Sequence, residues 1–188
     1  MNIAIKLAAG CGIGALLIGM IVGNGKSAPP PPSVPLPYDQ VGFVRSVATA
    51  KSAYKAANNQ LAAGGARSSR KQAICNALQG QSATGWVGKI AQLTSNGDGK
   101  GVVSIELAPD VHVATWNNAL SDIGARTLIE PTSSLFKSLA GMKRGDLVRF
   151  SGSFTSSDVD CVREQSVTLD GSMTDPVFTM RFSSVAKL

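Results

Sequence analysis

The sequence is poor in the residues that most often carry catalysis or bind metals. It contains one histidine, His112, and three cysteines among 188 residues. A single histidine excludes sites built from several imidazoles, and together with two separated cysteines it cannot complete a tetrahedral zinc site of the usual spacing. No serine lies in a nucleophile elbow. We therefore expect no enzyme activity, no metal site and no cofactor.

Long apolar runs are equally scarce, because only residues 7–25 form a long uncharged, mostly apolar stretch. As a helix this stretch would span about 28 Å, close to the thickness of the hydrocarbon core of a bilayer. A single run excludes a multispan membrane protein, and the ordinary hydrophobic content of 44% excludes a fully disordered chain. We expect residues 1–26 to be an N-terminal membrane anchor.

Two other interpretations of this stretch stay open. A cleaved secretory signal has the same charged start and apolar middle, although the small residues at Ser27 and Ala28 run directly into Pro29. Cys11 follows small residues as in a lipoprotein signal, but most of the apolar run comes after the cysteine. Glycines four residues apart would let two such helices approach closely, so a homo-oligomer is a further alternative.

The short tail that contains Lys6 is expected to stay in the cytoplasm. The rest of the chain would then lie on the periplasmic or outer side of the inner membrane, attached by a single span. Six of the nine prolines fall within residues 27–37. Such a run favours polyproline II, so residues 27–38 are expected to form a semi-rigid spacer of about 34 Å.

The net charge of +6 suggests an anionic partner, but the excess is confined to one segment. Residues 40–80 carry six basic side chains and no acidic one, whereas residues 81–188 carry ten basic and eleven acidic side chains. The segment could contact anionic lipid, nucleic acid or an acidic protein, or it could be a solvated face. Its basic residues are Arg45, Lys51, Lys55, Arg67, Arg70 and Lys71.

Residues 39–80 are expected to form a basic helical segment that precedes a β domain. Alanine-rich sequence with an apolar stripe predicts a helix over residues 39–63, ended by Gly64 and Gly65. A second, shorter helix is expected over residues 67–78.

Residues 81–188 alternate apolar and polar side chains in short segments separated by turns, which is typical of strands. Asn96 to Gly99 is a hairpin signal, and a short helix capped by Thr132 or Ser133 is expected to run through Leu139. This order predicts a mainly β fold, an OB-like, partly open barrel of five to six strands. The expected strands are residues 85–94, 101–107, 111–116, 146–155, 161–169 and 177–184.

Several short motifs resemble those of the tRNA-anti-like OB-fold family of small bacterial proteins. That resemblance implies an OB-fold behind a helical lead-in and a membrane-attached protein, and it implies no catalytic residue. The matching residues are Ala53-Tyr54, Asn58-Asn59, Gly85-Trp86-Val87-Gly88-Lys89-Ile90, Leu139, Gly145-Asp146-Leu147-Val148 and Gly152.

Cys75 and Cys161 lie outside the apolar stretch. Two cysteines in a short exported domain suggest a disulfide, with two separate buried thiols as the alternative. A bridge closing a loop of this length would contribute about 4 kcal/mol by the chain-entropy relation.

OB-folds commonly bind ligands across their second and third strands through aromatic platforms and cationic grooves. Lys100, Trp116 and Arg126 are the candidate ligand-binding residues of that region. The near-neutral charge of residues 81–188 disfavours strong phosphate binding. We therefore expect a membrane-anchored, extracytoplasmic module that contacts an envelope protein partner, and the alternative is a single-stranded nucleic-acid-binding protein in DNA transfer or uptake.

Overall fold

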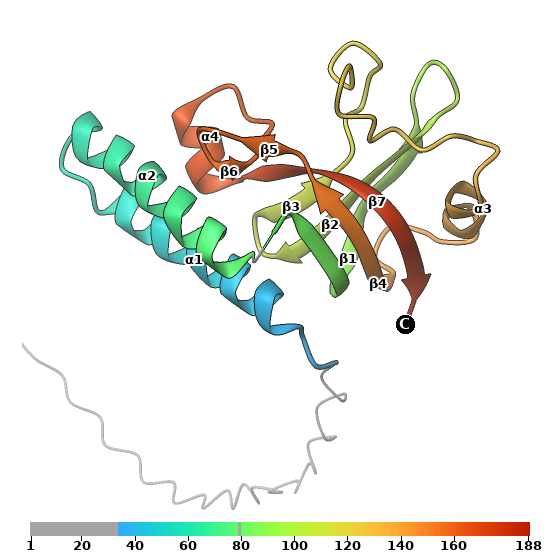
Figure 1. Ribbon diagram of the computed structural model, residues 1–188, viewed down its shortest axis with the longest axis horizontal. Helices are drawn as coiled ribbons and strands as arrows, with labels where there is room; N and C mark the ends of the chain where they lie inside the picture. Colours follow the sequence, from blue (N-terminus) through green and yellow to red (C-terminus); the bar gives the residue numbers. More distant parts are fainter. Residues whose placement is uncertain (1–33, 79) are drawn as a thin grey trace, which may run out of the picture. The chain divides into compact units, whose positions relative to one another are not determined.

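The computed structural model describes residues 34–78 and 80–188. Within these residues two long helices come first and a β-barrel with two short helices follows (Figure 1). The elements are α1 (Tyr38–Lys55), α2 (Gln60–Ala77), β1 (Ser82–Ser95), β2 (Gly101–Ala108), β3 (Val111–Ala114), α3 (Ser134–Ala140), β4 (Leu147–Phe154), β5 (Ser156–Ser157), β6 (Cys161–Val162), α4 (Leu169–Thr174) and β7 (Val177–Lys187).

Five strands form a closed barrel in the order β1-β2-β3-β7-β4, and β3 pairs with β7 in parallel while the other pairs are antiparallel. This is an OB-like arrangement, so the prediction of a mainly β, OB-like barrel is confirmed. The expectation of a partly open barrel is wrong. The barrel closes because the 14-residue β1 pairs with β2 and with β4, and Lys89 is opposite both Glu106 and Leu147.

The core joins the barrel to α1. Phe43 of α1 is fully buried and its ring lies 5.3 Å from the Trp86 ring and 4.9 Å from the Phe178 ring. The Gln40 side chain bonds to both backbone groups of Val87, donating from Nε2 at 2.6 Å and accepting at Oε1 at 2.9 Å. The α1–α2 pair therefore closes one side of the barrel, opposite α3 (Figure 1).

The helix boundary predicted at Gly64 and Gly65 is wrong, because both glycines lie inside α2. The chain breaks earlier, between Lys55 and Gln60. Asn59 begins α2 with an extended backbone, and its side chain accepts a hydrogen bond from the Ala62 amide. A capping asparagine supplies a helix start, whereas exposed glycines inside a helix only weaken it.

The strand predicted over residues 161–169 is also wrong, because β6 ends at Val162 and α4 begins at Leu169. Thr168 caps α4 by accepting from the Gly171 amide. The other barrel strands lie within a few residues of the predicted segments. The hairpin at Asn96 to Gly99 is confirmed, with Gly99 at a φ of 77°, and Ser133 is the cap of α3.

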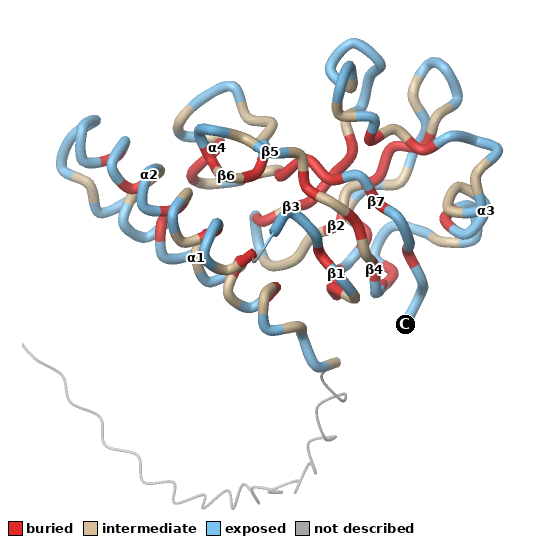
Figure 2. Tube along the Cα trace, in the orientation of Figure 1, coloured by how far each residue is buried: buried red, intermediate tan, exposed pale blue. Residues whose placement is uncertain are grey.

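A disulfide joins Cys75 of α2 to Cys161 of β6, as predicted. It ties the helical pair to the β5–β6 ribbon. The buried positions are concentrated in the barrel strands and recur along the two long helices, while the long loops are exposed at their tips (Figure 2). Within residues 34–78 and 80–188, no helix is long and apolar enough to cross a membrane. The predicted anchor, residues 1–26, and most of the predicted spacer lie outside the described residues.

Candidate functional site

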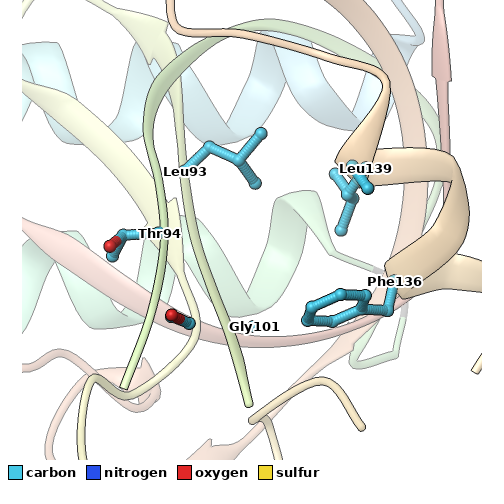
Figure 3. A pocket seen from close by; sticks show the side chains of 7 residues that line it. Leu93, Thr94, Gly101, Phe136 and Leu139 are labelled. Carbon is cyan, nitrogen blue, oxygen red and sulfur yellow. The ribbon is translucent and has the colours of Figure 1, made fainter. Parts of the chain in front are cut away.

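An apolar groove of about 380 Å³ lies between the barrel and α3. We call it the α3 groove. Leu93 points into it from β1, and Phe136 and Leu139 point into it from α3, whereas the Thr94 side chain points away (Figure 3). The groove is lined by Leu93, Thr94, Ser95, Gly101, Phe136, Leu139 and Ala140.

Local structure fixes the groove's main side chains. The Ser133 hydroxyl accepts a hydrogen bond from the Phe136 amide at 3.1 Å, and this cap starts α3 in the orientation that turns Phe136 toward the barrel. Gly101 faces the ring, and a Cβ at that position would lie 3.2 Å from Phe136 Cδ2 and 3.2 Å from Ile129 Cβ. A glycine at the start of β2 therefore lets α3 approach the sheet closely.

An ion pair lies beside the groove. Lys100 Nζ donates to Glu130 Oε1 at 2.6 Å, and this hydrogen bond raises the pKa of Lys100. Gly101 and Ile129 exchange backbone hydrogen bonds at 2.7 and 3.1 Å, which holds residues 129 and 130 against β2. The groove's rim is thus built from backbone pairing and one exposed salt bridge.

Residues 116–128 form a loop at the same end of the barrel as the β1–β2 turn (Figure 1), and we call it the tip loop. Asp122 organises the loop, because its carboxylate accepts from the Thr127 amide and hydroxyl, both at 2.7 Å. The Thr127 hydroxyl in turn accepts from the Trp116 amide at 2.8 Å. With its neck fixed, the loop presents Leu120 and Ile123 to solvent, 80% and 77% exposed.

The three predicted ligand residues lie around this end of the barrel but do not form one cluster. Trp116 and Arg126 both flank the neck of the tip loop; Trp116 is half-buried and Arg126 is exposed with a φ of 51°. Lys100 is engaged by Glu130. Among the described residues no hydrogen bond or ion pair connects Lys100 to Trp116 or Arg126, and the indole Nε1 of Trp116 is buried without a partner.

The basic residues predicted to form a patch are largely used inside the protein. Arg67 and Arg70 both donate to the carboxylate of Asp160, at 2.6 and 2.7 Å. Lys51 pairs with Asp110 at 2.9 Å, and Lys71 donates to a backbone carbonyl. Arg45 and Lys55 have no ion pair among the described residues, so the six side chains are not one free cationic surface.

The Asp160 site was missed by sequence reasoning, which gave this residue no role. Arg70 and Asp160 are 1% and 3% exposed, and Arg70 also donates to the Ser172 carbonyl. Burial raises the pKa of Asp160, but hydrogen bonds from Arg67 and Arg70 and their charges outweigh it, so the pKa lies below its ordinary value. The only sequence signal was a basic segment without acids followed by an aspartate beside a disulfide cysteine.

The described residues contain no group of three or more histidine, cysteine, aspartate or glutamate side chains arranged to hold a metal ion. His112 is on β3, with its Nδ1 3.5 Å from Asp175 Oδ1. The α3 groove was also missed, although Phe136 and Leu139 are three residues apart in a correctly predicted helix. That spacing places both side chains on one helix face.

The fold and the site define a closed OB-like barrel. The α1–α2 pair covers one side of it and is joined to β6 by a disulfide, and an apolar groove lies on the opposite side. No protein-family model matches the chain, and no curated protein sequence matches it significantly.

Proposed function

We propose that this protein is a membrane-anchored binding module whose OB-like barrel contacts an envelope protein partner outside the cytoplasm. The observation that carries the proposal is the α3 groove, an apolar hollow whose walls stand on β1, β2 and α3. Concave apolar sites on rigid elements are the usual places where ligands and partner side chains bind. Leu93 and Phe136, both only partly buried, would provide the contact area, and Lys100 and Glu130 would form its polar rim.

The disulfide between Cys75 and Cys161 supports the extracytoplasmic placement, because disulfides persist mainly in oxidising compartments. The single apolar stretch at residues 7–25 supports the anchor. Membership in the tRNA-anti-like OB-fold family belongs to the same proposal, and the helical lead-in, the closed barrel and the helix before β4 support it.

Binding of single-stranded nucleic acid has less support. Base stacking needs exposed aromatic rings, and six of the ten aromatic side chains are buried in the core. The outward positions of β2 and β3 carry Ser104, Glu106 and His112. An acidic side chain at the middle of this face opposes phosphate.

Site-specific crosslinking in native membranes tests the proposal. A photoreactive residue at Ala140, which is exposed at the groove, is expected to give a discrete protein adduct. The same residue at Leu61, 88% exposed on α2, is the matched control. Ser95→Arg would place a charged side chain at the groove and is expected to remove the Ala140 adduct without lowering the melting temperature, because Ser95 is exposed.

Adducts from Leu61 but not from Ala140 would show that the partner binds elsewhere, and they would overturn the assignment of the α3 groove as the binding site. A topology reporter fused after Leu188 that is active only in the cytoplasm would contradict the placement outside. Salt-sensitive retention on single-stranded DNA together with absent protein adducts would favour the nucleic-acid alternative.

A further inference from the structure

The outer surface of three neighbouring strands carries charge of one sign. Within β1, β4 and β7 every charged side chain is basic. This contrasts with the near-neutral total for residues 81–188, because the acidic residues of that range lie in loops, on β2 and on α4. The basic residues of these strands are Lys89, Arg149, Arg181 and Lys187.

The strand register aligns three of these side chains, Lys89, Arg149 and Arg181, in a row, whereas Lys187 is opposite the buried Val148. Lys89 is directly opposite Leu147, and Arg149 follows Leu147 two residues along β4 on the same face. Arg181 of β7 is opposite Ser153, four residues beyond Arg149. The Arg149 stem lies over the backbone at Gly85, where an added Cβ would be 4.0 Å from Arg149 Cδ, so the row runs along the outside of the barrel.

The turn before β4 adds two exposed basic residues, Lys143 and Arg144. Its one acidic residue, Asp146, is buried, accepts from the Lys143 amide and pairs with Lys187 at 2.9 Å. Asp146 therefore neutralises Lys187 and leaves the other cations unpaired within the described part of the chain. We call these cations the cationic face: Lys89, Lys143, Arg144, Arg149 and Arg181.

Glu106 marks the boundary of this face. It is opposite Lys89 across the β1–β2 pair, but no ion pair joins the two side chains. On the far side of Glu106 lies the β2–β3 surface with its mixed charges. The cationic face is thus distinct from the α3 groove and from the surface on which OB-folds commonly bind ligands.

Apolar side chains lie among the cations and beside the point where the chain enters the barrel domain. Leu147 is 41% exposed between Lys89 and Arg149, and Leu36 is 46% exposed. Leu36, Lys89 and Leu147 line one shallow hollow, with Glu106 on its β2 side. In the sequence only residues 26–35 separate Leu36 from the apolar stretch at residues 7–25. A spacer of this length limits how far the barrel can lie from a bilayer, but it does not keep the barrel from contacting the bilayer surface.

We infer that the cationic face docks on the anionic phospholipid headgroups of the membrane that holds the chain. The inference rests on the proposed anchor. Five unpaired cations along one side of the barrel, with an exposed leucine between Lys89 and Arg149, match a surface that offers phosphates with an apolar layer beneath them. A polyanion without an apolar part would make no favourable contact with Leu36 and Leu147. The strands of the cationic face also present no exposed aromatic ring that could stack with a base.

The test uses the full chain in nanodiscs with a photoreactive residue in place of Leu147. The discs contain phosphatidylcholine alone or phosphatidylcholine with one third phosphatidylglycerol. Lipid adducts, read by the mass of the chain, are expected in the phosphatidylglycerol discs. They are expected to fall when salt is raised from about 0.1 M, where the screening length is about 10 Å, to about 1 M, where it is about 3 Å. A photoreactive residue at Leu120, 80% exposed in the tip loop, should give few adducts.

The double variant Lys89→Gln, Arg149→Gln is expected to lower the adduct yield about twenty-fivefold, since each basic residue near an anionic surface changes binding about fivefold. Arg45→Gln, Lys55→Gln removes the same charge from α1 and should leave the yield unchanged. Equal yields from Leu147 in both disc types, or equal loss in both double variants, would overturn the inference.

If the proposed membrane anchor is wrong, the experiment gives a different result from the one that would overturn lipid docking. If the full chain does not enter discs of either composition, the proposed function fails. The docking is then tested on the free chain by sedimentation with vesicles of the same two compositions. Binding to single-stranded DNA at about 0.1 M salt without binding to phosphatidylglycerol vesicles would reject the lipid and favour nucleic acid.

Discussion

The guanidinium of Arg70 lies 2.7 Å from the carboxylate of Asp160, and both side chains are almost completely withdrawn from solvent. The Arg67 guanidinium also donates to this carboxylate, with Nη2 2.6 Å from Asp160 Oδ2. The arrangement connects α2 to the turn before β6, one residue from the disulfide. The basic helical segment is therefore attached to the barrel by charge as well as by packing.

Loss of the buried carboxylate should be costly. Asp160→Ala leaves Arg70 charged and buried, and breaking a buried pair in this way typically costs about 3 to 5 kcal/mol. Urea unfolding monitored by circular dichroism measures the change. Asp158→Ala in the same turn is the control, because Asp158 is exposed and surface changes usually stay within about 0.5 kcal/mol. Equal effects of the two substitutions would refute a structural role for the Asp160 pair.

The stability contributed by Asp160 should depend on pH. Because the pKa of Asp160 is lower in the folded protein, its contribution is complete above the unfolded pKa of about 3.9 and is lost as the pH falls through the folded value. The free energy of unfolding should therefore decline in acid. In Asp160→Asn the decline between about pH 5 and about pH 2 should be shallower, whereas parallel curves for the two proteins would contradict the assignment.

Removal of the disulfide should destabilise the helical pair. The bridge spans 86 residues, and the chain-entropy relation gives about 4 to 5 kcal/mol for a loop of this size. Cys75→Ala, Cys161→Ala should lower the unfolding free energy by about that amount. Cys11→Ser is the control and should keep both the bridge and the stability. Thiol labelling of the unreduced, denatured protein at positions 75 and 161 would show that no bridge exists.

Glycines in different environments should respond in opposite directions. A Cβ at Gly88 would lie 2.5 Å from Ile105 Cγ2 and 2.6 Å from the Glu106 carbonyl oxygen. Gly88→Ala should therefore cost about 1 to 3 kcal/mol through overpacking. Gly64→Ala, with nothing within 4 Å of the added carbon, should stabilise α2 by about 0.5 to 1 kcal/mol. Thermal unfolding of both variants distinguishes them, and a neutral Gly88→Ala would mean that β1 and β2 separate easily.

Local patterns accounted for most of the elements. Alternation identified the barrel strands, Asn96 to Gly99 identified the first hairpin, and the polar residue before an apolar run identified the start of α3. These features were readable because each depends on residues a few positions apart. The pairing of Cys75 with Cys161 was also predicted, because only two cysteines lie outside the apolar stretch.

Local reasoning failed where two local signals competed. Gly64 and Gly65 suggested a helix end, but Asn59 had already provided the break and the start of α2. The sequence after Cys161 alternated like a strand, yet Thr168 capped a helix there. In both places a side-chain hydrogen bond to the backbone caps the helix that forms, and whether such a cap forms depends on how the flanking segments pack.

By itself the sequence determined the order of the helical segment, the five barrel strands and α3, the confinement of excess charge to residues 40–80, and the scarcity of catalytic residue types. Only the tertiary structure decided what that charge does, because Arg67 and Arg70 find their partner some ninety residues away. It also decided barrel closure, the α3 groove and the row from Lys89 to Arg181. Each of these depends on strand register and long-range packing, which bring together side chains that no local pattern relates.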